Sequence, residues 1–210
     1  MTGQSSNDSA FGRVLAGAAG VAQLLWDRGW AEHNAGNLSC DVTGIVPAGH
    51  ADDGPLTPLR AAFPELSGRC LLVTGAGSRM RDVAHEPEAW CGVLRFSDGG
   101  AAYGVSWHGR ARKAFTPTSE LPSHLAIHAA LLRRGAALRA IVHTHPTELL
   151  ALSLEPGVDD EGRFNRLLWS LHPEAVVVVP SGVAVVPYVM PGTVEQGMAA
   201  GRAMETHDVA

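Results

Sequence analysis

The sequence predicts an α/β sandwich built on a mixed sheet. Segments with helical periodicity and segments typical of strands interleave irregularly along the chain, which disfavours strict βαβ repetition. The chain has 210 residues, 46% of them hydrophobic and 18% charged, which is enough apolar material for one core. We therefore expect a single domain over residues 10–210, preceded by a flexible tail at residues 1–9.

The first half of the chain predicts one helix followed by strands. Apolar residues recur at three- and four-residue intervals over residues 11–30 and give one stripe, with Gly29 as a plausible stop. The stripe consists of Val14, Leu15, Ala18, Val21, Ala22, Leu25 and Trp26. Residues 38–46 suit a strand, whereas 47–68 are rich in Pro, Gly and Asp and predict a long irregular excursion. Further strands are expected at residues 70–75, 90–97 and 101–107.

In the second half of the chain, the expected helices and strands alternate at shorter intervals. We expect helices at about residues 119–134, 146–154 and 162–171, with a strand at 138–145 between the first two. The valine-rich stretch 175–189 predicts two buried strands around a turn at residues 180–182. Thr193 with Gln196 three residues later forms a capping-box signature, which predicts the start of a last helix.

Charge and cysteine content exclude several classes of protein. A formal net charge of -5 and a pI near 6.0 provide no overall attraction for nucleic acid or an anionic membrane. Small soluble substrates are therefore the expected partners. The three cysteines are widely spaced and odd in number, which fits reduced thiols in the cytoplasm better than a disulfide framework or a zinc knuckle. No apolar run reaches the roughly 20 residues that a membrane-spanning helix needs.

The stretch "IVHTHPTELLALS", residues 141–153, contains the clearest candidate for chemistry. In an extended strand, His143 and His145 project from the same face, so their imidazoles can be aimed at one point. That geometry suits a divalent metal such as zinc, for which imidazole is a common neutral ligand. The alternative is that both rings lie at a strand end and only bond to loop carbonyls.

The helix upstream adds further candidates. Thr118 or Ser119 offers a helix cap, and the first-turn amides of such a helix can receive an anion. Glu120 follows directly; its carboxylate either complements the helix dipole or acts as a general acid or base. His124 and His128 lie four residues apart and form a competing metal pair, although their apolar neighbours favour buried core histidines.

Two turns could approach a phosphate. The strand at 70–75 runs into Gly75-Ala76-Gly77, where backbone amides could cradle an anion or simply form a tight turn. In "HNAGNLS", Asn34 and Asn37 either hold a left-handed turn conformation or donate amide hydrogens to a ligand.

Six collinear blocks resemble the class II aldolase/adducin family. They are "GWAEHNAGNLS", "LLVTGAGSRMRDV", "PTSELPSHLAIH", "IVHTHPTELLALS", "LLWSLHPEAVVVVPSGVAVVPYVMPGT" and the helix that follows. The resemblance covers nearly the whole chain. It implies a three-layer α/β/α sandwich with a mixed, mostly antiparallel central sheet. The long excursion is similar to the branch of the family that cleaves L-rhamnulose 1-phosphate.

The resemblance also implies an activity and a site. The activity is the zinc-dependent retro-aldol cleavage of L-rhamnulose 1-phosphate to dihydroxyacetone phosphate and L-lactaldehyde, by a cytoplasmic homotetramer. Zinc would be held by His143 and His145. Glu120 would be the catalytic acid/base, and Glu174 a second carboxylate that handles the aldehyde-side hydroxyl. The phosphate and carbonyl would be bound by Asn34, Asn37, Gly75, Thr118 and Ser119.

Two positions depart from the family pattern. Ala76 stands where a serine is expected in the glycine loop, which removes one hydroxyl donor unless Ser78 compensates. The family's third zinc histidine falls beyond Ala210, so we expect a C-terminally truncated form that lacks the closing strand and helix; the alternatives are a locally replaced ligand and an inactive site. The alternative functions are a related sugar-phosphate aldolase, epimerase or dehydratase, or a non-catalytic adducin-like scaffold.

Overall fold

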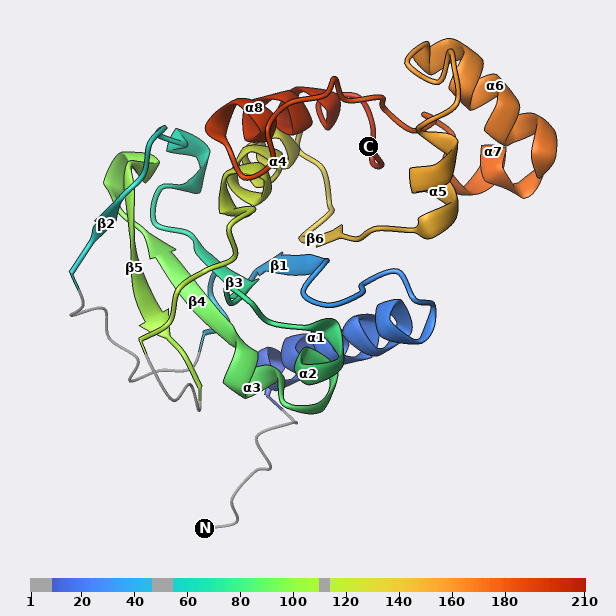
Figure 1. The fold of residues 1–210 in the computed structure, drawn as a ribbon. Helices are drawn as coiled ribbons and strands as arrows, with labels where there is room; N and C mark the ends of the chain where they lie inside the picture. Colours follow the sequence, from blue (N-terminus) through green and yellow to red (C-terminus); the bar gives the residue numbers. More distant parts are fainter. Residues whose placement is uncertain (1–8, 47–54, 110–113) are drawn as a thin grey trace. The chain divides into compact units, whose positions relative to one another are not determined.

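A computed structural model describes residues 9–46, 55–109 and 114–210, and the chain in it divides into two compact units (Figure 1). The first unit holds residues up to Ser119 together with Arg139–Pro146. The second holds Glu120–Leu138 and Thr147–Ala210. Residues 1–8 of the expected tail at 1–9, and residues 47–54 of the excursion, lie outside the described residues. Ser9, the last residue of the expected tail, is the N-cap of the first helix. The single domain expected for residues 10–210 stays a prediction.

The N-terminal helix forms as the apolar stripe predicts. Helix α1 spans Ala10–Asp27, and its first turn is capped by Ser9, whose Oγ accepts a hydrogen bond from the Gly12 amide at 2.9 Å. The helix buries Phe11, Leu15, Ala22 and Leu25 along one face. Gly29 follows with a φ of 69°, a left-handed conformation that ends the helix at little cost for a residue without a Cβ.

The first unit is organised around a six-stranded sheet in the order β2-β5-β4-β3-β1-β6. The strands are β1 (Asn37–Asp41), β2 (Thr57–Pro58), β3 (Cys70–Thr74), β4 (Cys91–Phe96), β5 (Ala102–Trp107) and β6 (Ala140–His143). All five strand pairs are antiparallel. The last residue pair between β1 and β3 is Ser39 with Val73. The predicted α/β fold class with a mostly antiparallel sheet is confirmed.

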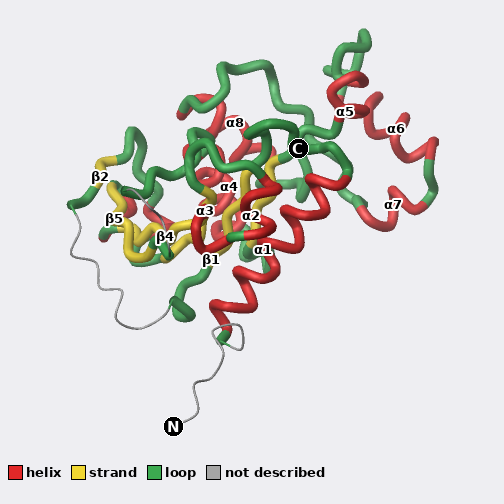
Figure 2. The backbone as a smooth tube through the Cα atoms, turned by 60° about the horizontal axis from the view of Figure 1, so that its bottom comes forward, coloured by secondary structure: helices red, strands yellow, loops and turns green. Residues whose placement is uncertain are grey.

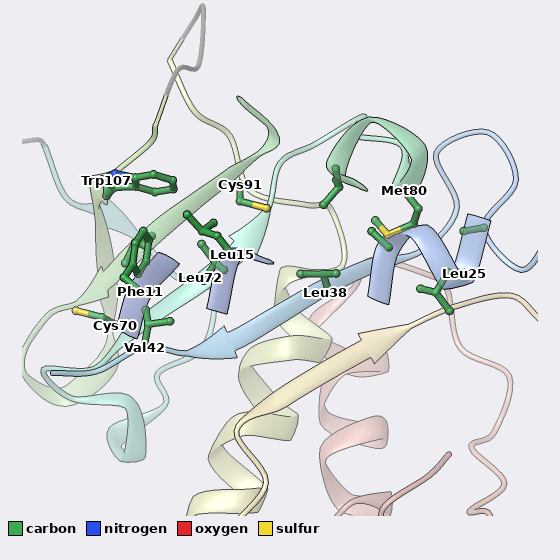
Figure 3. Packing of buried hydrophobic residues seen from close by; sticks show 14 residues of the cluster. Phe11, Leu15, Leu25, Leu38, Val42, Cys70, Leu72, Met80, Cys91 and Trp107 are labelled. Carbon is green, nitrogen blue, oxygen red and sulfur yellow. The ribbon is translucent and has the colours of Figure 1, made fainter. Parts of the chain in front are cut away.

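Short helices complete the first unit: α2 (Met80–His85), α3 (Pro87–Trp90), and the 3₁₀ turns η2 (Pro64–Leu66) and η3 (Asp98–Gly100). Helices α1, α2 and α3 lie on one face of the sheet, as the tube in Figure 2 also shows. Between this face and the helices lies the apolar core of Figure 3. Phe11 of α1 meets Trp107 of β5 edge to face, with ring centroids 5.0 Å apart. Burial of this cluster fixes the sheet on which the candidate residues lie.

The second unit is helical. It contains α4 (Leu121–Arg133), α5 (Thr147–Leu152), α6 (Glu161–Leu171), α7 (Glu174–Val178) and α8 (Val194–Ala203). Helices α4 and α8 pack closely because two glycines of α8 face α4. A Cβ at Gly197 would lie 2.6 Å from the Pro122 carbonyl oxygen, and one at Gly201 would lie 3.0 Å from the Ala126 Cβ. The capping box is confirmed in part: Thr193 Oγ1 accepts from the Gln196 amide at 3.2 Å, but Gln196 Oε1 accepts from Gly192 rather than Thr193.

The prediction of two buried strands at residues 175–189 is wrong. Residues 174–178 form α7, and Val177 and Val178 are 79% and 76% exposed. The stretch that follows has one isolated bridge, between Val183 and Val209. A β-branched run favours a strand only when a neighbouring strand satisfies its backbone groups, and the described part of the second unit offers none. The turn itself is confirmed, since the Gly182 amide donates to the Val179 carbonyl at 3.0 Å.

Two predictions from composition can be compared with the described residues. Cys40, Cys70 and Cys91 are all free thiols, in agreement with the cysteine count. Among the helices of the described ranges, none combines the length and apolar character needed to cross a membrane.

Candidate functional site

The His-Thr-His segment is anchored by one main-chain oxygen. Strand β6 ends at His143, so His145 lies just beyond the strand rather than within it. The carbonyl oxygen of Trp30 accepts two hydrogen bonds from this segment, from the His145 amide at 2.8 Å and from the Thr144 hydroxyl at 2.7 Å. The segment therefore stays extended past the strand end, and both imidazoles are held on one side.

The two imidazoles converge, as the strand geometry predicts. The Nε2 atoms of His143 and His145 are 2.9 Å apart, and the rings meet edge to face with centroids 4.8 Å apart. Burial lowers the pKa of His143 below its usual value, and the electrostatic interaction with the neighbouring His145 lowers it further. Both effects favour the neutral form of His143, which is the form that binds a metal ion.

The pair fits two positions around a zinc ion. In a tetrahedral site with Zn–N bonds of about 2.0 Å, two ligand nitrogens lie about 3.3 Å apart, so a movement of a few tenths of an ångström would admit the metal. Catalytic zinc sites commonly have three protein ligands, and structural sites have four. Over residues 9–46, 55–109 and 114–210 no cluster of three or more His, Cys, Asp or Glu side chains is arranged to hold a metal. The described residues thus supply two ligands and no third.

The other histidines do not extend the pair. His124 and His128 of α4 are 1% and 3% exposed, which confirms that they are core residues. His172 lies exposed in the connection directly after α6. His207 lies beyond the end of α8, and its Nε2 is 3.5 Å from Glu161 Oε1.

The turn at residues 31–37 brings Asn37 beside the histidine pair. Asn37 is 7% exposed and pairs with His143 across β1 and β6. The left-handed positions of the turn are His33 and Gly36, with φ of 52° and 83°, so the two asparagines are not needed for the turn conformation. Gly36 permits the close approach, since a Cβ there would lie 3.2 Å from the His143 carbonyl oxygen. Asn34 is exposed in the same turn. Donation to a ligand remains the interpretation for both asparagines.

The glycine loop is a tight turn in this structure. The amides of Gly75 and Ala76 donate to the carbonyls of Trp90 and Thr116, each at 2.8 Å. The Ser78 amide donates back to Gly75 at 3.2 Å. Three amides of the loop are therefore committed to the protein, which favours the turn interpretation over an amide cradle. A phosphate at this loop would depend on side-chain donors from neighbouring segments.

Ser78 does not compensate for the missing serine at position 76. Ser78 is 3% exposed, whereas Ala76 is exposed in the same loop. A buried hydroxyl is not available to a ligand that binds the exposed side of the turn. The loop therefore has one donor fewer than the family pattern, as the sequence indicated.

The expected helix cap at Thr118 or Ser119 is wrong. Helix α4 begins at Leu121 with Glu120 in the N-cap position, and no side chain caps it. Thr118 cannot serve because its amide donates to the Thr74 carbonyl at 3.0 Å, which ties it to the sheet. Thr118 is 8% exposed and Ser119 is exposed. Glu120 is half-buried, and its carbonyl accepts the first amides of the helix, from Ser123 and His124.

The structure groups the candidate residues by unit. In the first unit, Asn37 lies beside His143, and Gly75 and Thr118 both adjoin Thr74. In the second unit, Glu120 precedes α4 and Glu174 is the exposed first residue of α7. Each carboxylate therefore lies at the start of a helix, and neither belongs to the sheet that carries the histidine pair.

Sequence reasoning missed two contributors in the first unit. The carbonyl of Trp30 carries no side-chain signal, so no motif could reveal it. Thr74 does carry a signal, a single hydroxyl residue that ends the apolar run "CLLV" immediately before a glycine. Thr74 is fully buried, and its Oγ1 accepts a hydrogen bond from the Leu38 amide at 3.2 Å.

Comparisons with known proteins agree with the fold and the motifs. The family model for the Class II Aldolase and Adducin N-terminal domain matches residues 17–210. A rhamnulose-1-phosphate aldolase of Bacteroides thetaiotaomicron is 34% identical over 206 residues, covering 97% of this chain and 75% of the relative. One from Escherichia coli is 36% identical over 192 residues, covering 88% and 68%. A crystal structure of a sugar-phosphate aldolase from Thermotoga maritima superposes with a TM-score of 0.76 at 31% identity, over 93% of this chain and 79% of that one.

Proposed function

Because the chain belongs to the class II aldolase and adducin family, and its relatives are aldolases, we propose that it cleaves L-rhamnulose 1-phosphate to dihydroxyacetone phosphate and L-lactaldehyde. The family and the relatives support a carbon–carbon lyase; the substrate and the dependence on zinc are the proposal. The observation that carries it is the convergence of His143 and His145, with Nε2 atoms 2.9 Å apart.

The histidine pair would hold a zinc ion. When bound, the metal supplies Lewis-acid stabilisation of the negative charge that develops on the ketose oxygens. The low pKa of His143 supports this role, because a neutral imidazole keeps a lone pair for the metal. The Trp30 carbonyl, which holds the segment through two hydrogen bonds, keeps both rings oriented before the metal binds.

Retro-aldol cleavage requires two proton movements, and two carboxylates are the candidates. The C4 hydroxyl must lose a proton as the C3–C4 bond breaks and its electron pair moves toward the C2 carbonyl. We assign this proton to Glu174. The resulting fragment must then gain a proton at C3 to become dihydroxyacetone phosphate. We assign this second proton to Glu120. A carboxyl group that lies within reach of the reacting carbon can donate a proton to it or remove one from it.

Binding of the phosphate and carbonyl is assigned to the turns of the first unit. Asn34 and Ser119 offer exposed donors, whereas Asn37 and Thr118, which are 7% and 8% exposed, are assigned by the family resemblance. Gly75 is assigned to this group by the family resemblance, and packing also favours glycine there, since a Cβ would lie 3.1 Å from the Phe115 ring. Hydrogen bonds to a charged phosphate are stronger than those between neutral groups, so a few such donors suffice.

A non-catalytic, adducin-like scaffold is the second candidate. The observation that favours it is that the described ranges hold no cluster of three metal-ligating side chains. A related aldolase, epimerase or dehydratase acting on another sugar phosphate is a variant of the first proposal, because discrimination by a hydroxyl or methyl group depends on the shape of the binding site.

Metal analysis separates the enzyme from the scaffold. The purified chain is supplemented with zinc, dialysed, and its metal content is measured beside that of His143→Ala and His145→Ala. The aldolase proposal expects about one zinc per wild-type chain and a loss of zinc in both variants. A matched control is His172→Ala, which changes an exposed histidine outside the pair. Wild-type protein that retains no zinc would support the scaffold.

Substrate assays then test the activity. Release of dihydroxyacetone phosphate from L-rhamnulose 1-phosphate is followed with a coupled dehydrogenase, before and after removal of zinc by a chelator. We expect release that stops on chelation and returns with zinc. Turnover of L-fuculose 1-phosphate or L-ribulose 5-phosphate, without release from the rhamnulose compound, would move the assignment to a sister activity.

We also propose the cytoplasm as the compartment and a homotetramer as the assembly. The three free cysteines support a reducing environment. The tetramer rests on the family resemblance, and sedimentation velocity of the 22.0 kDa chain tests it by the mass of the main species.

A further inference from the structure

The pairing of β1 with β3 ends, with Ser39 and Val73, at the point where the candidate ligands begin. Strand β1 keeps its pairing with β6 on its other edge as far as Asn37 with His143, and β3 keeps its pairing with β4 as far as Thr74 with Cys91. Gly75, directly after β3, forms a bridge with Pro117. Asn37 on β1 and Gly75 after β3 therefore both lie beyond the last backbone pair that joins the two strands.

The side chain of Thr74 continues the link between the two strands. In the register of β1 and β3, Leu38 and Thr74 face each other directly after the last backbone pair. Thr74 Oγ1 accepts a hydrogen bond from the Leu38 amide at 3.2 Å and donates to the Leu38 carbonyl at 3.4 Å. One hydroxyl thus takes the place of backbone pairing directly after the last β1–β3 residue pair.

The main chain of Thr74 is tied to the other ligand segments. Its carbonyl accepts a hydrogen bond from the Thr118 amide at 3.0 Å, and Gly75 is its neighbour in sequence. Leu38, which its hydroxyl holds, is the neighbour of Asn37. Thr74 is fully buried, so it has no direct contact with solvent or with a ligand in solution.

We propose that Thr74 is a positioning residue that fixes Asn37, Gly75 and Thr118 relative to one another for binding the phosphorylated substrate. The inference rests on the proposed function, in which these three residues hold the phosphate and carbonyl. Thr74 acts through its neighbours, so its loss weakens binding in the ground state and in the transition state equally.

Three single variants test the role of the hydroxyl. Thr74→Val removes it with little change in volume, and Thr74→Ser retains it. Ser106→Ala is the matched control, since Ser106 is a buried residue of β5 whose hydroxyl donates to the Val93 carbonyl at 3.4 Å. β5 pairs with neither β1 nor β3. If Thr74→Val does not fold, Thr74→Ala takes its place with the same expected result.

For Thr74→Val we expect the KM for L-rhamnulose 1-phosphate to rise about tenfold, with kcat changed by less than about twofold. Thr74→Ser should restore KM to within about twofold of wild type, and Ser106→Ala should leave it unchanged. The dissociation constant of inorganic phosphate, measured by calorimetry, should rise in Thr74→Val by the same factor as KM.

Each other outcome has a defined meaning. An unchanged KM in Thr74→Val, no recovery in Thr74→Ser, or an equal rise in Ser106→Ala overturns the positioning role. If the wild-type chain does not cleave the sugar phosphate, the proposed function fails. The titration with inorganic phosphate is then the only test of the positioning role of Thr74. Weaker phosphate binding in Thr74→Val then still supports the inference, whereas equal binding, or no binding by wild type, overturns it.

Discussion

At the level of single residues, the candidate histidines owe their orientation to atoms that belong to other segments. The Trp30 carbonyl fixes the backbone of the pair, and Gly36 lets the preceding turn reach the His143 carbonyl. Asn37 is brought beside His143 by strand pairing. The chemistry of the pair could be predicted from its spacing, but its supports could not, because main-chain contacts leave no pattern in the sequence.

The role of Glu120 leads to a first prediction. Glu120→Gln removes the ionisable carboxyl group but keeps the size of the side chain and its ability to form hydrogen bonds. Zinc content should stay at the wild-type level, while release of dihydroxyacetone phosphate should fall by about a hundredfold or more. The measurements are metal analysis and the coupled assay on the same preparation.

Glu195→Gln is the control for this prediction, because Glu195 is an exposed carboxylate in the first turn of α8 and has no proposed role. It should leave turnover unchanged. Wild-type turnover in Glu120→Gln would remove Glu120 from the mechanism, and a loss of zinc in that variant would point instead to a role in holding the metal.

Cys91 leads to a second prediction, on stability. Burial raises the pKa of its thiol from 9.0 to about 12, so the folded chain keeps the proton at a pH where the unfolded chain has lost it. The contribution to stability is therefore complete below pH 9 and is lost as the pH rises toward 12. Between pH 8 and 10, ionisation of the unfolded thiol should lower the free energy of unfolding by about 1 kcal/mol.

The comparison that isolates this effect is the pH dependence of urea unfolding in wild type and Cys91→Ala. The variant should lose less stability than wild type between pH 8 and 10, whatever its stability at pH 8. Identical pH dependence in the two proteins would show that the Cys91 thiol does not control stability in this range.

At the level of elements, the sequence pattern predicted helices α1, α4, α5, α6 and α8 and every described strand except β2, but not helices α2, α3 and α7. It failed where tertiary partners decide. The stripe of α1 and the apolar runs of β3 and β4 gave correct elements because burial follows directly from the pattern. The valine run at residues 176–179 has the composition of a strand but lies in and just after α7. The cap of α4 moved to Glu120 because a contact from β3 holds Thr118 in the sheet.

The packing of α4 against α8 leads to a third prediction. Gly197→Ala should destabilise the chain by about 1–3 kcal/mol, because the new Cβ would lie 2.6 Å from the Pro122 carbonyl oxygen. Gly17→Ala is the matched control in α1, where nothing lies within 4 Å of the added carbon. It should stabilise by about 0.5–1 kcal/mol, since alanine is the better helix former.

Urea unfolding of both variants checks the prediction. Both substitutions add the same methyl group to a helix. The informative result is therefore that they change the free energy of unfolding in opposite directions, more than the size of either change. A neutral Gly197→Ala would show that the two helices can move apart at no cost.

At the level of the whole molecule, the sequence predicted the fold class and the family, and left the completeness of the metal site open. Six collinear blocks were enough for both, because each block combines a local structural signal with a residue suited to chemistry. The ligand count could not be resolved in the same way. Coordination depends on side chains from distant segments, and the described residues bring only the two histidines together.

Linkage between zinc and folding leads to a fourth prediction. A metal that binds only the folded chain raises its free energy of unfolding by about 2.7 kcal/mol at a free concentration of one hundred times Kd. The Tm of the wild-type chain should therefore rise with zinc concentration, and that of His143→Ala should not. Magnesium is the control ion, since it prefers oxygen ligands. A Tm insensitive to zinc in the wild type would mean that the pair does not bind the metal.

The double acceptor at Trp30 has a consequence for mutational scanning. Every substitution at position 30 keeps the carbonyl oxygen, so a scan of that position reports on the indole, which packs against the apolar core and lies beneath Arg28. Substitutions at Thr144, whose hydroxyl donates to that oxygen, should instead disturb the histidine pair. A map of mutational tolerance would therefore assign the support of the histidines to Thr144 alone, and would miss the main-chain acceptor that Thr144 shares with the His145 amide.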